Sequence, residues 1–373
     1  MFDELSKQID MCSACPSLCQ SACPVFQNDA NKSHSPWGMM QVLGRVERSE
    51  MPFDASIAKM SYHCLTCRAC TEQCEHNIDI AGILHHTRNL AVQNEIAPPE
   101  MHGFLEKFHR HNNPFSKDLL DKLSKLLPEK IFKKNSPTAY FASCTTIAKA
   151  PEVITDTFSL FEKLKIDFVS PYTDPIQCCG YPLYSAGAEY DFIDIAEINY
   201  HSLKSKKLII TGSPACAHTL KNTYARYDFN LEGQVMTINE FLKPYLKNIN
   251  YKLKKTLRSK LLYHDPCYLS RYLGEIDLPR EMISQMSGEA PMEFHDHGKC
   301  SSCSGQGGCY SIIEKEKADQ ITQSRLSECH EKKVNLVVTQ CPTCLHKMRK
   351  NSKSLIIKDL ISYLNDCIEG VIE

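Results

Sequence analysis

The sequence lacks several features that would place it in a membrane, on nucleic acid or outside the cell. Its 373 residues contain no uninterrupted apolar stretch long enough to span a bilayer. The opening segment, MFDELSKQIDMC, has acidic side chains and none of the apolar character of a signal peptide. The formal net charge is −1, without the basic excess of a nucleic-acid-binding protein. These absences predict a cytoplasmic protein and leave open peripheral contact with the inner face of a membrane.

The chain also lacks a dinucleotide-binding fingerprint. No G-x-G-x-x-G follows a predicted strand, and the glycine-rich segment SGQGG lies among cysteines. We therefore expect no flavin or nicotinamide site in this chain. Substrate chemistry that needs such a cofactor is expected in a partner protein.

Cysteine, by contrast, is abundant, with 20 residues. Disulfide scaffolds of that density are usually short secreted chains, and this chain has the length of two or three domains. In a reducing compartment, clustered thiols indicate metal or redox chemistry.

Two short runs carry eight of the cysteines. The second, CLTCRACTEQC, has the C-x2-C-x2-C-x3-C spacing of bacterial ferredoxins, and the first, CSACPSLCQSACP, has one extra residue between its second and third cysteines. A zinc site usually draws its four ligands from two pairs separated by a loop, whereas each run here supplies four thiols unaided. The spacing predicts two [4Fe-4S] clusters. The predicted metal ligands in the runs are Cys12, Cys15, Cys19, Cys23, Cys64, Cys67, Cys70 and Cys74.

The two runs are also expected to exchange ligands. In two-cluster ferredoxins the last cysteine of each run binds the cluster of the other run. One cluster would then be held by Cys12, Cys15, Cys19 and Cys74, and the other by Cys64, Cys67, Cys70 and Cys23.

The pattern along the chain predicts a helical module followed by two α/β domains. Residues 1–110 show helix signals, such as Ser35-Pro36 and the capping residue Asp79, and few strand signals, so an all-helical ferredoxin-like module is expected. Residues 111–136 contain an amphipathic linker helix, for which packing on the core is favoured over a membrane-surface role. Short apolar runs then alternate with helical segments, which predicts parallel sheets covered by helices over residues 137–250 and 251–373. The basic stretch KPYLKNINYKLKKTLRSK between the halves is expected to be a solvated linker.

The two α/β halves repeat one cysteine pattern. Cys144 corresponds to Cys267, Cys178 to Cys303 and Cys216 to Cys344, at separations of 123, 125 and 128 positions. Near-constant separations indicate a duplicated domain. The cysteines follow predicted strands, at the carboxyl edge of a parallel sheet where open α/β folds place ligands. Cys341 opens a predicted helix, whose N-terminus stabilises an anionic thiolate.

These motifs resemble an iron–sulfur subunit family that includes the glycolate oxidase iron–sulfur subunit, the anaerobic glycerol-3-phosphate dehydrogenase C subunit and heterodisulfide reductase subunits. The resemblance spans nearly the whole chain and includes HDPCYLSRYLGEIDLPR and SPWG. The family pattern of each cysteine-rich CCG domain is a lone Cys, then CC, then CxxC. This chain has Ser213 where the first CxxC would begin, Ser304 in place of the second Cys of a pair, and Glu75 where a Pro usually follows Cys74.

Each CCG domain therefore offers four thiols, enough for one further iron–sulfur cluster but one short of the five-thiolate site that the resemblance implies for heterodisulfide reductase. The predicted ligands are Cys144, Cys178, Cys179 and Cys216 in the first domain and Cys267, Cys303, Cys341 and Cys344 in the second. The alternative is that one of the two repeats is structural and holds no cluster. Cys329 and Cys367 lie in helical patterns and are expected to be buried apolar residues.

The favoured function is an electron-transfer subunit of an oxidoreductase. The resemblance implies a flavin-containing dehydrogenase partner that acts on a 2-hydroxy acid or glycerol 3-phosphate, and a further acceptor, membrane-anchored or quinone-reactive. The alternatives are a catalytic heterodisulfide or disulfide reductase that uses a CCG cluster, and a zinc-stabilised interaction module.

Overall fold

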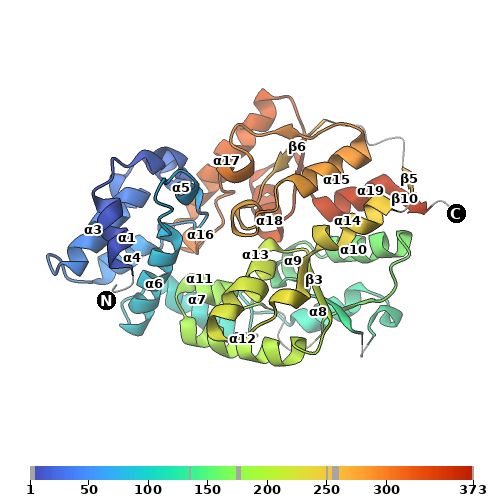
Figure 1. Cartoon of the computed structure of the whole chain (residues 1–373), viewed down its shortest axis with the longest axis horizontal. Coiled ribbons are helices and arrows are strands. Elements are labelled where there is room, and N and C mark those ends of the chain that lie inside the picture. The colour runs from blue at the N-terminus through green and yellow to red at the C-terminus, as the bar shows by residue number, and fades with distance from the viewer. Residues whose placement is uncertain (1–4, 134–135, 174–177, 249–250, 254–259, 372–373) are drawn as a thin grey trace.

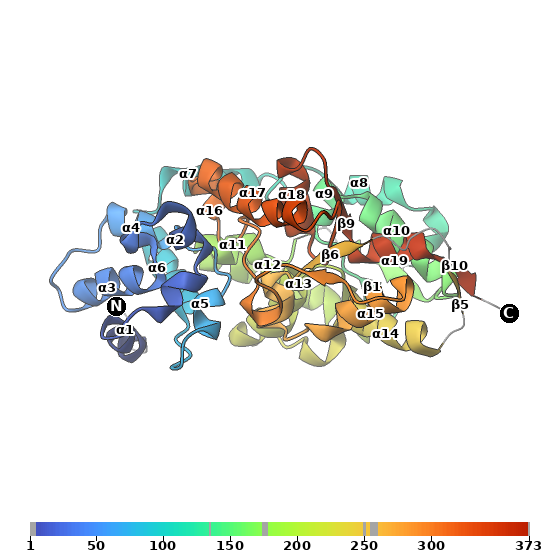
Figure 2. The same ribbon diagram turned by 90° about the horizontal axis from the view of Figure 1, so that it is seen from above.

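The computed structural model describes residues 5–133, 136–173, 178–248, 251–253 and 260–371. Helices of the first hundred residues lie at one end of the molecule, and the two α/β domains make up the rest (Figure 1). A view from above shows the same arrangement, with the C-terminus at the opposite end from helices α1 to α6 (Figure 2). In the described part of the chain, no helix is long and apolar enough to cross a membrane.

The elements described before residue 138 are all helices. Two of them begin where the sequence predicted, because Ser35 Oγ accepts a hydrogen bond from Gly38 N–H and Asp79 Oδ1 accepts one from Gly82 N–H. The α-helices of this part are α1 (Ser6–Ser13), α2 (Pro24–Asp29), α3 (Pro36–Glu47), α4 (Ala55–Ser61), α5 (Ala69–Glu72), α6 (Ile80–Gln93), α7 (Pro99–His109) and α8 (Leu119–Leu126). Leu119 and Leu123 of α8 are buried in the core of the first α/β domain, as expected for a connecting helix.

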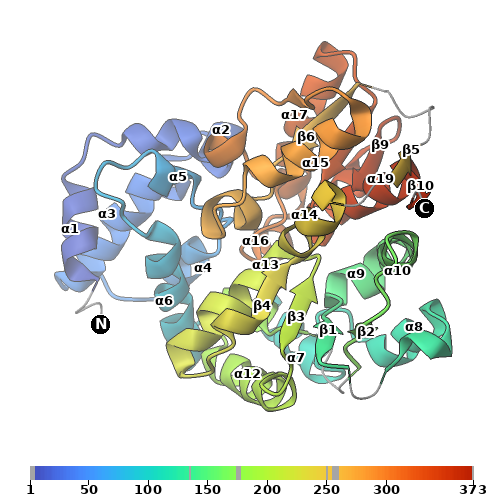
Figure 3. The same cartoon turned by 45° about the vertical axis from the view of Figure 1, so that its right-hand side comes forward.

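The first α/β domain contains a parallel sheet of order β2-β1-β3-β4. Figure 3 shows its strands side by side in this order. The crossover helices follow the strands as the alternating pattern predicted. The elements are β1 (Thr138–Tyr140), α9 (Cys144–Lys149), α10 (Glu152–Lys163), β2 (Val169–Pro171), α11 (Tyr181–Ala186), α12 (Glu189–Leu203), β3 (Leu208–Thr211), α13 (Pro214–His218), β4 (Val235–Thr237) and α14 (Ile238–Asn248).

The second α/β domain repeats this topology with the order β7-β6-β8-β9, again parallel. The predicted mixture of helices and parallel sheets in a duplicated arrangement is therefore present. Its elements are β6 (Leu261–His264), α15 (Asp277–Ser287), β7 (Met292–Glu293), α16 (Tyr310–Ile313), α17 (Lys315–Glu331), β8 (Leu336–Thr339), α18 (Pro342–Asn351), β9 (Ile356–Asp359) and α19 (Leu360–Cys367).

The expected solvated linker between the halves is wrong in part. Its first residues belong to α14, and Tyr251–Leu253 form strand β5, which pairs antiparallel with β10 (Ile368–Val371). The apolar side chains of α14, such as Leu246, are buried. Their burial stabilises a packed helix in this segment although the segment is rich in lysine. Residues 249–250 and 254–259 of the stretch lie outside the described residues.

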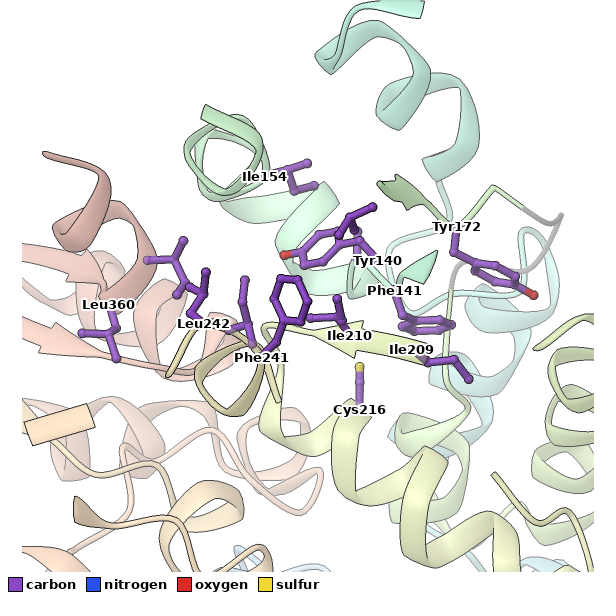
Figure 4. Close-up of a cluster of buried hydrophobic side chains, with 14 of the residues drawn as sticks. Tyr140, Phe141, Ile154, Tyr172, Ile209, Ile210, Cys216, Phe241, Leu242 and Leu360 are labelled. Atoms are coloured by element: carbon purple, nitrogen blue, oxygen red, sulfur yellow. The ribbon is translucent and has the colours of Figure 1, made fainter. Parts of the chain in front are cut away.

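One hydrophobic core runs through both α/β domains. Figure 4 shows Tyr140, Ile210 and Phe241 of the first domain in line with Leu360 of the second. The contact is reinforced by Ser362 Oγ, which donates a hydrogen bond to Asp156. Because the core is shared, the two domains form one packed body.

The second α/β domain also packs on the helical module through a glycine loop. A Cβ atom added at Gly307 would lie 2.2 Å from the carbonyl oxygen of Leu65, and one added at Gly308 would lie 2.1 Å from that of Cys64. Only glycine permits so close an approach of two backbones.

We expect Gly308→Ala to destabilise the iron-loaded protein by more than the roughly 1–2 kcal/mol that a left-handed backbone costs a residue with a Cβ. Gly308 has φ of +63°, and the added methyl group also meets the Cys64 carbonyl. Gly288→Ala is the matched control, because its φ is +83° and nothing lies within 4 Å of its Cβ position. Thermal unfolding of both variants measures the difference, and equal shifts would show that the contact with Cys64 carries no stability.

Candidate metal centres

The first cysteine run winds along α1 and the 3-10 turn Leu18–Ala22, and Cys23 immediately precedes α2. The second run forms a tight loop in which Thr66 and Arg68 both have positive φ. Thr66 N–H donates a hydrogen bond to Cys64 Sγ at 3.2 Å. Backbone strain of this kind, about 1–3 kcal/mol per residue, persists where the surroundings hold a site in place.

The last cysteine of the first run lies with the second run. The thiols of Cys64 and Cys67 act electrostatically on Cys23. Those of Cys64, Cys67 and Cys23 act on Cys70, with a smaller contribution from Cys19 of the first run. Burial raises the pKa of Cys23 above its usual range, and the neighbouring thiols raise it further. All four side chains line one cavity.

The last cysteine of the second run lies, in turn, with the first run. Burial raises the pKa of Cys12 to about 12, and the neighbouring thiols of Cys19, Cys15 and Cys74 add to the effect. Burial raises the pKa of Cys19 to about 11, again with a contribution from Cys74. Thiols crowded in this way resist ionisation unless a cation neutralises them, so the donor set suits a group that brings several iron ions.

No group of three or more His, Cys, Asp or Glu side chains in the described residues is arranged to hold a single metal ion. A structural zinc site requires four ligands around one ion. In a [4Fe-4S] cluster each thiolate binds a different iron, so the sulfur atoms stand farther apart. Each thiol set supplies the four cysteines that a [4Fe-4S] cluster requires.

In the first α/β domain the four predicted cysteines form one chain of thiol contacts. Cys179 accepts hydrogen bonds from Cys178 and Cys216, which hold its pKa well below the usual range, and Cys178 is also in contact with Cys144. Gly180, with φ of +82°, turns the backbone away directly after the pair. All four side chains are buried.

Ser213 has a structural role at this site. It is the N-cap of α13, and its Oγ accepts from Cys216 N–H at 3.5 Å. The residue that replaces the expected cysteine thus positions the backbone of a neighbouring one.

The second α/β domain brings its four predicted cysteines together as well. Cys267 and Cys303 are hydrogen-bonded to each other, and so are Cys341 and Cys344. Cys267 and Cys303 also act electrostatically on Cys344. The bond from Cys267, together with the N–H groups of Gly305 and Gly307, lowers the pKa of Cys303 to about 6. Cys341 is the N-cap of α18, at the helix N-terminus predicted for it.

Ser304 faces the same group of thiols. Its Oγ donates a hydrogen bond to Cys344 Sγ at 3.1 Å. Ser304 is therefore a hydrogen-bond partner of this thiol group.

The second thiol set of the helical module adjoins the second α/β site. Cys303 acts electrostatically on Cys64 and Cys67, and Cys67 acts on Cys267. The buried residues Val25, Leu65, Cys67, Cys303 and Tyr310 belong to one hydrophobic cluster. Two sites far apart in sequence are thus neighbours in space.

Three of the other cysteines and two histidines have environments of their own. Cys329 and Cys367 are buried in helices, as predicted, while Cys300 is exposed. His264 is buried, and burial lowers its pKa well below the usual value. His218 packs against Tyr268 and Tyr272, and burial lowers its pKa to about 4.

Sequence reasoning missed two arginines at these sites, Arg88 and Arg271. Both are buried, and each donates a hydrogen bond to a backbone carbonyl oxygen of the second cysteine run. One signal was present for Arg88. It follows Ile80 and Leu84 at four-residue spacing, on the apolar face of the predicted helix.

Comparison with known proteins matches these domains. The family described as a 4Fe-4S dicluster domain matches residues 8–78, and the family described as a cysteine-rich domain, CCG, matches residues 138–221 and 261–349. The chain therefore combines a 4Fe-4S dicluster domain with two CCG domains, as the sequence motifs indicated.

Several curated relatives cover most of this chain. This chain is 26% identical over 317 residues to the D subunit of the dihydromethanophenazine:CoB–CoM heterodisulfide reductase of Methanosarcina mazei. The aligned region covers 83% of this chain and 76% of that protein. The chain is 26% identical over 351 residues to the B subunit of the fumarate reductase (CoM/CoB) of Methanothermobacter marburgensis, covering 91% and 67%. It is 27% identical over 320 residues to the EtfAB:quinone oxidoreductase of Syntrophomonas wolfei, covering 79% and 43%. These relatives are oxidoreductases or their subunits.

Proposed function

We propose that this chain is the electron-transfer subunit of an oxidoreductase and relays electrons between a flavin-containing dehydrogenase and a further acceptor. The observation that carries the proposal is the continuous series of thiol groups from the helical module into the second CCG domain. Residues 1–110 would act as an all-helical ferredoxin-like module. The partner would oxidise a 2-hydroxy acid or glycerol 3-phosphate, and the acceptor would be membrane-anchored or quinone-reactive, with the chain cytoplasmic or peripheral at the membrane.

The cysteines would hold the clusters in crossed sets. Cys12, Cys15, Cys19 and Cys74 would hold one [4Fe-4S] cluster, and Cys23, Cys64, Cys67 and Cys70 the other. The two CCG groups would each hold one further cluster through the four cysteines already described. Such clusters supply one-electron transfer when bound. The protein's part is to bury the thiols, fix their spacing and bring the sets close together.

A second candidate, catalytic disulfide reduction, is favoured by one cavity. It is lined by residues that adjoin predicted ligands of three thiol sets, among them Thr66, Tyr181, His218 and Tyr268. The two serines at the CCG sites weigh against it, because each leaves its domain with four thiols.

We expect the purified iron-loaded chain, once reduced with dithionite and freed of the excess, to reduce an artificial dye. It should reduce no dye when given a 2-hydroxy acid or glycerol 3-phosphate. Addition of the flavin-containing partner should make dye reduction depend on that substrate. Anaerobic stopped-flow absorbance measures both steps. Substrate-dependent dye reduction by the chain alone would overturn the proposal, and steady cleavage of a disulfide by the reduced chain alone would establish the second candidate.

A further inference from the structure

Two buried arginines donate hydrogen bonds to the backbone of the second cysteine run. Arg88 of α6 is 0% exposed, and Arg271, four residues after Cys267, is 8% exposed. The Arg88 Nη2 group donates to the carbonyl oxygen of Cys64 at 2.9 Å, and the Arg271 Nε group donates to that of Cys67. One arginine comes from the helical module and the other from the second CCG domain.

Neither guanidinium group has a carboxylate partner within the described residues. The other acceptors of Arg88 are the carbonyl oxygens of Ser61 and Ser185. Those of Arg271 are the carbonyl oxygens of Lys299 and Ser301, and its Nη2 atom is buried without a hydrogen-bond partner. Moving a charged group from water to a buried position without a counter-ion costs roughly several kcal/mol of free energy, even where carbonyl groups solvate the charge.

The thiols of the proposed ligand sets, which are thiolates when they bind iron, lie beside these cations. Arg88 acts electrostatically on Cys64, and Arg271 acts on Cys67, Cys267 and Cys303. Arg88 also acts on Cys309, which belongs to neither set. Asp79 opposes Arg88 at Cys64, but its side chain is 38% exposed and lies 3.7 Å from the Arg68 guanidinium, so water and Arg68 screen it. Four thiolates carry more negative charge than the iron–sulfide core offsets, so a cluster at this place would be the missing counter-ion.

The first thiol set has a different environment. The charged groups that act on Cys12 and Cys19 are other thiols, and no guanidinium is among them. Reduction adds one negative charge to a cluster, and a nearby buried cation stabilises that charge because the surrounding dielectric constant is low. The two clusters should therefore differ in reduction potential.

We propose that Arg88 and Arg271 raise the reduction potential of the cluster held by Cys23, Cys64, Cys67 and Cys70 above that of the first cluster. Electrons that enter the helical module then collect at the second cluster, next to the second CCG site. Arg271 lies next to both of these sites, and its positive charge acts on thiols of each. This inference rests on the proposed function, since it requires clusters in the two crossed sets.

The test is a redox titration of the iron-loaded protein, followed by electron paramagnetic resonance. Cys15→Ser assigns the signal of the first cluster. In the unmodified protein the second cluster should accept its electron at the higher potential, and equal or inverted potentials would overturn the inference. This arm needs no arginine variant to fold.

Arg271→Gln should shift the electron distribution at least tenfold away from the second cluster, which corresponds to about 59 mV for one electron. Arg271→Lys keeps the charge and should retain most of the potential. Arg48→Gln removes an exposed guanidinium near the first run and should change neither potential. Equal shifts in the Gln and Lys variants, or no shift at full iron content, would show that Arg271 is only structural. Absence of both clusters from the unmodified protein would instead refute the proposed function.

Discussion

Removal of iron is expected to unfold the helical module while both α/β domains stay folded. After chelation, amide groups in α1, α3 and α5 should exchange as if opening cost about 1 kcal/mol or less, while those in β1, β3, β6 and β8 stay protected. Binding energy at a metal site is folding energy, because the site does not exist in the unfolded chain. Hydrogen exchange with mass spectrometry on the loaded and stripped protein measures the difference.

The physical reason is the size of the two cores. The helical module has a small hydrophobic cluster that includes Cys12 and packs against Cys64, Cys70 and Cys74, so its interior is partly built from predicted ligands. The core shared by the α/β domains contains many aromatic and branched side chains, such as Phe161, Ile209 and Tyr263. Equal loss of protection in both regions would contradict this reasoning, as would full protection of α1 in the stripped protein.

Cys23→Ser is expected to abolish the second cluster of the helical module and leave the first intact. Cys23 belongs to the first run in sequence but lies with Cys64, Cys67 and Cys70 in space. Serine is a poor iron ligand at neutral pH, because its hydroxyl group must lose a much less acidic proton than a thiol. Iron content should fall by the content of one cluster, as measured by iron analysis together with electron paramagnetic resonance.

Cys74→Ser is the reciprocal variant and should abolish the first cluster. Cys300→Ser makes the same chemical change at an exposed cysteine and should leave the iron content unchanged. If Cys23→Ser instead removed the signal assigned to the first cluster, each run would hold its own cluster and the crossed assignment would be wrong.

The sequence alone determined the chemistry of this protein, because ligand spacing is a local property. The second run places four cysteines within eleven residues, and this spacing is typical of an iron–sulfur cluster site. The separations between the repeated cysteines likewise indicated a duplicated domain, and the two sheets have the same strand order. Helix starts at Ser35 and Asp79 could be predicted because a cap depends on a few neighbouring residues.

Other features were decided only by the tertiary structure. The basic stretch after residue 242 looked like a linker, yet β5 within it pairs with β10 more than a hundred residues later. Local composition does not predict such pairing, because the hydrogen bonds that stabilise the strand come from a partner strand far away in the sequence. The same holds for Ser213 and Ser304, whose roles as a helix cap and a hydrogen-bond donor depend on where Cys216 and Cys344 lie.

The arrangement of the sites relative to one another is the clearest case. Neither the spacing of Cys64 and Cys67 nor that of Cys267 and Cys303 indicates that the two groups are neighbours. Their proximity follows from Gly307 and Gly308, which let two backbones approach, and from Arg271, which reaches from one site to the other. Predicted ligands can be recognised from short-range spacing in the sequence. The distance between two ligand sets depends instead on how the domains pack, and this packing results from many contacts between residues far apart in the sequence.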